Sequence, residues 1–184
     1  MRELARLGQA LAAVACGVLF IDCAPNPPPR WAEGGAPLVI GEAHWDRADD
    51  DPIEITATGE VLEDGDPIFL VDRAGRLVDE DREPVAILLP DGFVAGPDNV
   101  LLGRVGHSNA APPGSAAAWL SILPNGQAVV FDSDGEREGD GVWRGCDGPK
   151  LRTCTFVMHM VRMRNYRDQR GGGVTFGVGV GVGL

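Results

Sequence analysis

The chain has 184 residues, 44% of them hydrophobic, which is enough for one packed domain together with processing segments. Its formal net charge is −11 at pH 7. An acidic chain is a poor match for nucleic acid or for electrostatic attachment to anionic lipid, because both need a basic surface. We therefore expect no nucleic-acid partner, and we expect acidic clusters such as 49–51 to solvate turns.

The first 22 residues have the organisation of an export signal. Arg2 and Arg6 precede an almost uncharged stretch, rich in Ala, Leu and Val, that runs from Leu7 to Ile21. This stretch is about 15 residues long, whereas a membrane-spanning helix needs about 20. A basic start and a short apolar run are typical of a secretory signal peptide, to which we assign residues 1–22.

Cys23 follows the apolar run and precedes a proline-rich stretch at residues 25–29. With this cysteine at its end, the segment resembles the signal of bacterial lipoproteins, in which a lipidated cysteine becomes the first mature residue. Cys16 is the alternative, because small residues precede it, whereas Asp22 departs from the pattern. We favour Cys23 because its lipidation leaves two cysteines in the rest of the chain to pair. Cleavage beyond both cysteines would instead give a soluble periplasmic or secreted protein.

Residues 23–37 are interpreted as a Pro-rich linker. Three consecutive prolines at 27–29 lack backbone donors and favour extended geometry, which suits a spacer between a lipid and a domain. The expected location is thus the bacterial cell envelope. We predict an outer-membrane lipoprotein that faces the periplasm or the exterior, with secretion as the alternative.

A glycine-punctuated motif repeats through the middle of the chain. An apolar stretch, a polar turn that ends in glycine and a second apolar stretch recur around Gly75, Gly92 and Gly126. The first two glycines are 17 residues apart and the last two are 34 apart, so a degenerate copy is expected at Asn109. A repeat this short holds two strands and two turns but no helix. It predicts an all-β domain over residues 38–166, in which tandem antiparallel hairpins form a small barrel, rosette or sandwich.

The repeat also resembles a known family. With its Asp-x-x-Gly turns, the region from about residue 59 to 131 is similar to the four-fold beta-flower domains of bacterial envelope and effector proteins. The biochemical role of that family is largely unassigned. The resemblance therefore implies a fold and adds almost no function.

The end of this domain is predicted to be a long strand over residues 153–164. Phe156, Met158 and Met160 alternate there with Val157, His159 and Val161, which would place the two sets on opposite faces. No segment from 38 to 164 shows a helical period with caps, so no helix is expected.

Cys146 and Cys154 are eight residues apart, around a Gly-Pro turn. In an exported protein this pair is expected to form a disulfide. Closing so short a loop stabilises the fold by roughly 2–3 kcal/mol in the chain-entropy account. A zinc site is not expected, because no second Cys or His pair stands at ligand spacing.

No catalytic site is predicted. His107 and Ser108 would supply a base and a hydroxyl group to a hydrolase, and Asp91 or Asp98 would complete the set. However, no nucleophile motif supports this arrangement. We expect no catalytic residue, no metal and no cofactor.

Residues 167–184 form a Gly/Val-rich tail, in which Val and Gly alternate near the end. As a strand, the tail would have one nearly bare backbone face, suited to strand addition to a partner or to the domain's own edge. A low-complexity tail without fixed structure is the alternative.

These features predict an exported, lipid-anchored, non-enzymatic envelope protein that binds or scaffolds a protein or glycan partner. Two alternatives stay open. One is a periplasmic or secreted hydrolase. The other is a structural subunit of an envelope assembly that is joined through its C-terminal strand.

Overall fold

The structure, a computed structural model, describes residues 25–170 except 133 and 136, with side chains as far as residue 165. The predicted signal peptide and both candidate lipidation sites, Cys16 and Cys23, lie outside the described residues. The C-terminal tail beyond residue 170, proposed for strand addition, also lies outside them.

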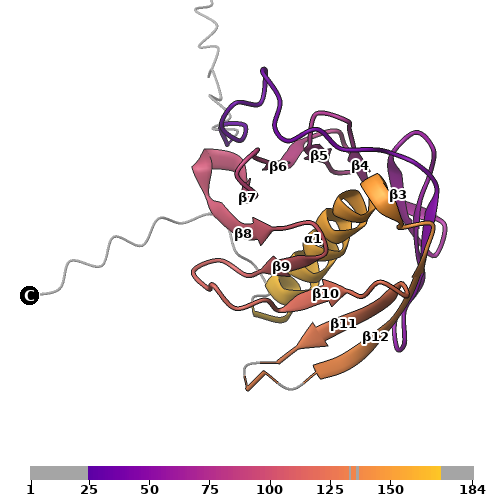
Figure 1. Ribbon diagram of the computed structural model, residues 1–184. Helices are drawn as coiled ribbons and strands as arrows, with labels where there is room; N and C mark the ends of the chain where they lie inside the picture. The colour runs from indigo at the N-terminus through magenta and orange to yellow at the C-terminus, as the bar shows by residue number, and fades with distance from the viewer. Residues whose placement is uncertain (1–24, 133, 136, 171–184) are drawn as a thin grey trace, which may run out of the picture.

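Twelve antiparallel strands in the described chain form a closed barrel (Figure 1). Each strand pairs with its neighbours in the sequence, and the ring closes where the first strand pairs with the last. The predicted all-β fold of tandem hairpins is therefore confirmed, with the barrel as its form. The strands are β1 Ala43–Asp46, β2 Ile53–Ile55, β3 Glu60–Glu63, β4 Asp66–Val71, β5 Arg76–Val78, β6 Pro84–Leu88, β7 Phe93–Ala95, β8 Leu101–Val105, β9 Asn109–Ala111, β10 Leu120–Ile122, β11 Gln127–Phe131 and β12 Arg137–Arg144.

An α-helix, α1 Leu151–Arg170, runs through the barrel (Figure 1). There are also two short 3-10 helices, η1 Pro97–Asn99 between β7 and β8 and η2 Gly148–Lys150 between β12 and α1. The alternating pattern predicts a strand over 153–164, and that prediction is wrong. Every residue from Thr153 to Val161 is buried, so the wall covers this part of α1 on all sides. A helix buried all round has no polar face and therefore no amphipathic period to reveal it.

The helix and the inner face of the wall share one hydrophobic core. Phe156 and Met158 of α1 are completely buried, as are Leu77, Leu88 and Leu120 of the wall. Each such side chain contributes roughly 1.5–3 kcal/mol when it is removed from water. No helix in the part of the chain that the structure describes is long and apolar enough to cross a membrane.

The hairpin turns are closed by a recurring set of hydrogen bonds. Between β6 and β7, the N–H of Gly92 donates to the carbonyl of Leu89 at 2.9 Å, and the N–H of Phe93 donates to the Asp91 carboxylate at 3.1 Å. The glycine N–H makes the same bond, to the carbonyl three residues earlier, at Gly59, Gly75 and Gly126. Part of the chain's acidic character thus serves to cap turns.

The carbonyl of each of these four turn glycines also accepts a hydrogen bond from a later strand. It accepts the backbone N–H of a residue 12 to 17 positions later, at 2.7–2.9 Å, in the pairs Gly59–Val71, Gly75–Leu88, Gly92–Val105 and Gly126–Trp143. At the degenerate copy, the Ser108 carbonyl accepts the N–H of Ile122 at 2.7 Å and Asn109 begins β9. A degenerate copy is therefore present, with Ser108, one residue before the predicted Asn109, at the position of the turn glycine.

These junctions leave no room for a side chain. Gly126 has φ +84°, and a Cβ atom there would lie 2.4 Å from the Trp143 carbonyl oxygen. Gly65, between β3 and β4, has nearly the same backbone conformation, φ +86°, but a Cβ atom there would meet nothing within 4 Å. Substitutions at these two glycines can therefore distinguish the cost of a side chain at positive φ, which both share, from the cost of the clash with the neighbouring strand, which only Gly126 has.

We predict that Gly65→Ala lowers the free energy of unfolding by roughly 1–2 kcal/mol, because Ala is strained at positive φ. Gly126→Ala should lose a further ~1–3 kcal/mol, because the neighbouring strand must move away. Urea denaturation followed by tryptophan fluorescence measures both losses. Equal losses in the two variants would show that the junction does not require glycine.

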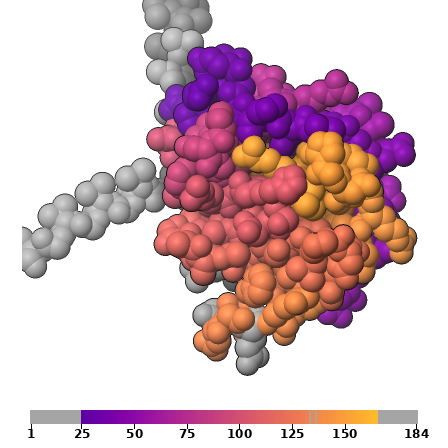
Figure 2. Space-filling model, in the orientation of Figure 1, coloured from indigo at the N-terminus to yellow at the C-terminus, as the bar shows by residue number. Residues whose placement is uncertain are grey.

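The end of the predicted linker 23–37 packs on the barrel. Ala36 is completely buried, and its N–H donates to the Leu88 carbonyl at 2.6 Å. The N–H of Gly35 donates to the Ala74 carbonyl at 2.6 Å. In Figure 2 this N-terminal segment, in indigo, covers one edge of the face on which the start of α1 is visible in orange. This part of the chain therefore belongs to the domain and is not a free spacer.

The predicted disulfide between Cys146 and Cys154 is present, with their Cα atoms 6.0 Å apart. Cys146 follows β12 and Cys154 lies in the first turn of α1. The bond therefore ties the last strand of the barrel to the helix that fills it.

Candidate functional site

A cavity of about 670 Å³ opens at the end of the barrel beside the second half of α1. Its size lies within the range of small-ligand sites. It is referred to below as the rim cavity. The lining residues that matter for the argument are Trp45, Arg47, Trp119, Asp140, Arg162 and Asn165.

Arg162 projects from α1 into the rim cavity. Its guanidinium carbon lies 4.8 Å from the centre of the Trp119 ring, which holds the cation in one orientation. No hydrogen bond or ion pair joins Arg162 to the rest of the described chain. Burial lowers the pKa of Arg162, while Asp140 and Glu138 act against that shift. The N–H groups at the edge of this guanidinium are consequently available to a ligand.

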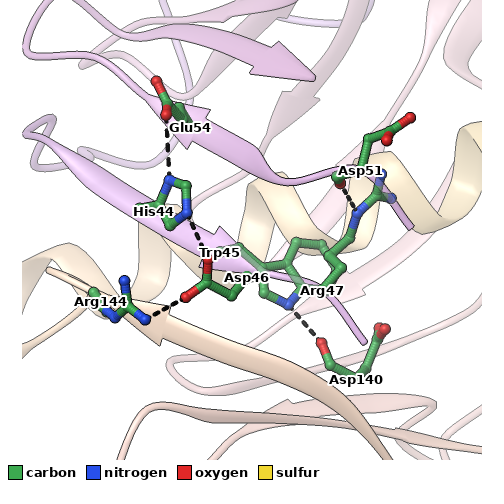
Figure 3. A network of polar contacts seen from close by, with 8 residues as sticks. All are labelled: His44, Trp45, Asp46, Arg47, Asp51, Glu54, Asp140 and Arg144. Atoms are coloured by element: carbon green, nitrogen blue, oxygen red, sulfur yellow. Dashed lines mark hydrogen bonds and ion pairs between the residues drawn. The ribbon is translucent and has the colours of Figure 1, made fainter. Parts of the chain in front are cut away.

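Asp140, on β12, is the second polar group of the cavity. Its backbone carbonyl accepts the indole N–H of Trp45 at 2.6 Å, which fixes the strand at this point (Figure 3). Its side chain accepts no hydrogen bond from any described residue. Burial raises the pKa of Asp140 to about 6. The positive charges of Arg162 and Arg47 oppose this shift, and the negative charge of the Asp50 carboxylate adds to it.

Arg47 also lines the cavity, but its guanidinium group is already paired with other residues of the protein. Its side chain is 3% exposed and pairs with Glu63 at 2.6 Å and with Asp50 at 3.5 Å. The other carboxylate oxygen of Glu63 pairs with Arg164 of α1 at 3.1 Å. Glu63 thus joins the loop after β1 to the helix, and Arg47 has a structural role at the edge of the cavity.

Within the part of the chain that the structure describes, neither the Arg162 guanidinium nor the Asp140 carboxyl group makes a hydrogen bond or an ion pair, although each shifts the pKa of the other. Such a site can donate hydrogen bonds from Arg162 and accept them at Asp140. Within the described ranges, no group of three or more His, Cys, Asp or Glu side chains is placed to hold a metal ion. The arrangement suits the binding of a polar molecule.

His159 lies one helical turn before Arg162 and is completely buried. The Trp119 indole N–H donates to its Nδ1 at 3.1 Å, and its Nε2 lies 2.9 Å from the Leu102 carbonyl. Because an indole N–H can only donate, Nδ1 must accept and Nε2 must carry the hydrogen. Burial lowers the pKa of His159 to about 4. The neutral ring is therefore part of the core.

This buried ring makes stability depend on pH. Between pH 6.5 and about 4 the unfolded chain protonates His159 and the native chain does not, so its contribution to stability is complete above pH 6.5 and falls as the pH drops through this window. His159→Gln keeps a donor and an acceptor but does not titrate. We predict that the wild type loses roughly 2–3 kcal/mol relative to His159→Gln between pH 7 and pH 4.5.

Urea denaturation of both proteins at the two pH values measures this difference. The comparison cancels the contribution of Asp140, whose raised pKa has the opposite sign and is common to both proteins. A stability difference that is the same at pH 7 and pH 4.5 would contradict the buried neutral assignment.

No hydrogen bond or ion pair between side chains joins the residues considered for a hydrolase in the part of the chain that the structure describes. His107 is exposed, and no hydrogen bond or ion pair links its ring to another residue of the described chain. Asp91 caps its own turn, and Asp98 accepts hydrogen bonds from Asn26. The third histidine, His44, lies on the outer face between Glu54 at 3.3 Å and Asp46 at 2.8 Å (Figure 3).

Sequence reasoning missed the residues of the rim cavity. Arg162 had one signal, since it is the first residue with a formal charge after the uncharged stretch from Thr153 to Val161. Asp140 had none, because it is one of many acidic residues in glycine-rich surroundings. Only closure of the barrel brings Asp140 near the helix.

Comparison of the chain with protein-family models, with curated proteins and with solved structures finds no match.

Proposed function

We propose that this protein is an exported, lipid-anchored, non-enzymatic component of the bacterial envelope that binds a glycan in the rim cavity. The observation that supports the binding role is that Arg162 and Asp140 both line the cavity and that neither side chain makes a hydrogen bond or an ion pair with a described residue. The proposed location rests on the lipoprotein-like segment that ends at Cys23.

The chemistry of the rim cavity favours a glycan over a protein partner. A sugar hydroxyl group both donates and accepts, so adjacent hydroxyls can satisfy Asp140 and Arg162 together. Protein interfaces, by contrast, depend on protruding aromatic or aliphatic anchors and on pockets that receive them. The aromatic side chains here, Trp45 and Trp119, are only 2% and 8% exposed, so they form a floor and do not protrude.

We predict that the full chain binds members of a panel of neutral, amino-bearing and acidic oligosaccharides, and that Arg162→Gln and Asp140→Asn each weaken binding about 10-fold or more. A hydrogen bond to a charged group is worth roughly 1.5–3 kcal/mol, which corresponds to this loss. Isothermal titration measures the affinities.

Two exposed residues outside the cavity provide matched controls. Arg73→Gln and Asp81→Asn make the same chemical changes at side chains without a polar partner in the described structure, and they should leave affinity unchanged. Equal weakening by the controls would remove the cavity as the site. Binding of peptides in place of every oligosaccharide would show that the partner is a protein.

The anchor is tested separately. We predict that radiolabelled palmitate enters the wild-type protein in a bacterial host and that Cys23→Ala abolishes the labelling. Cys16→Ala should still be labelled if Cys23 is the acceptor. Labelling that persists in Cys23→Ala and disappears in Cys16→Ala would move the anchor, and absence of label from the wild type would refute it.

A further inference from the structure

Three exposed apolar side chains gather on the outer face of the barrel beside η1. Phe93, Val100 and Leu101 are 40%, 37% and 45% exposed. In the ladder between β7 and β8, Phe93 lies opposite Arg104 and Leu101 lies opposite Ala95, and Val100 immediately precedes Leu101. These three residues form the η1 patch. Rather less than half of the surface of each residue is exposed.

The start of the described chain is fixed beside this patch. The backbone N–H and the side-chain amide of Asn26 donate to the Asp98 carboxylate at 3.1 and 2.8 Å. The N–H of Asp98 donates in return to the Asn26 carbonyl at 2.9 Å. Asp98 belongs to η1 and lies two residues before Val100. Figure 1 shows this indigo segment next to the connection between β7 and β8.

The length of the preceding chain limits how far the patch can lie from a membrane. Cys23 precedes Asn26 by three residues, which span at most about 10 Å when fully extended. A lipid on Cys23 would hold η1 at the bilayer surface. We infer that the η1 patch rests on the membrane, with Phe93, Val100 and Leu101 inserted at the boundary between headgroups and acyl chains. This inference rests on the proposed anchor at Cys23.

The properties of the patch fit a bilayer better than a protein. Three side chains are far fewer than a stable protein interface uses, so the patch would be a weak site for a free partner. Next to a lipid anchor, weak contacts suffice, because the anchor already keeps the two surfaces together. The guanidinium of Arg104 lies 5.4 Å from the Phe93 ring, where its long stem can keep the charge at headgroup level.

Depth-dependent quenching tests this orientation. The lipid-modified full chain carrying Leu101→Trp is placed in phosphatidylcholine vesicles with brominated acyl chains, and its fluorescence is compared with that of the wild type. The added tryptophan should emit at shorter wavelength and lose roughly half or more of its emission, because interfacial side chains lie near the acyl boundary. Val142→Trp is the matched control, since Val142 is similarly exposed, at 42%, on β12. Its emission should be unquenched.

Each outcome is decisive. Absence of quenching at position 101 in a membrane-bound, lipid-modified protein overturns the inference and leaves the anchor intact. Equal quenching at positions 101 and 142 also overturns it, because the barrel then has no preferred face. Failure of the anchor shows instead as loss of palmitate labelling and of vesicle binding. Circular dichroism confirms that both variants fold.

Discussion

The burial of α1 inside the barrel is the constraint on which the rest of the structure depends. A closed ring of twelve strands encloses a space that must be filled, and in the described chain that filling is supplied by one helix. Without it, the inward-facing side chains of the wall, such as Leu77 and Leu88, would line an open interior. The wall and the helix therefore stabilise each other, although the helix comes after all twelve strands in the sequence.

Two covalent or ionic ties hold the helix at its ends. The disulfide from Cys146 to Cys154 fixes the start of α1 to the end of β12. At the other end, Glu63 pairs with Arg164 of the helix and with Arg47 of the loop after β1. Because β12 and β1 are the strands that close the ring, the disulfide joins the helix to the seam of the barrel directly, and Glu63 of β3 joins it to the seam through Arg47. The rim cavity lies at this seam, where side chains from both ends of the sequence meet.

Much of this fold is accessible from sequence because hairpins are local. Gly75, Gly92 and Gly126 mark turns whose geometry needs glycine, so their spacing predicts the repeat and even its degenerate copy. The helix is not accessible in this way, because alternation of large apolar residues fits a buried helix as well as a strand. The pairing of Cys146 with Cys154 is also accessible, because the two cysteines are close in the sequence on either side of a Gly-Pro turn. The meeting of Asp140 with Arg162 does not, since it depends on the closure of the whole ring.

The buried polar contacts of Trp119 connect this packing to the cavity. A helix that is apolar all round can slide or rotate within its wall with little change in hydrophobic burial. The hydrogen bonds of His159 to Trp119 and Leu102 remove that freedom, because any shift would leave a buried donor and acceptor unpaired. Arg162 follows three positions later on the same helical face and stacks on the same indole. The depth of the helix, set by one neutral imidazole, therefore determines where the free guanidinium enters the rim cavity.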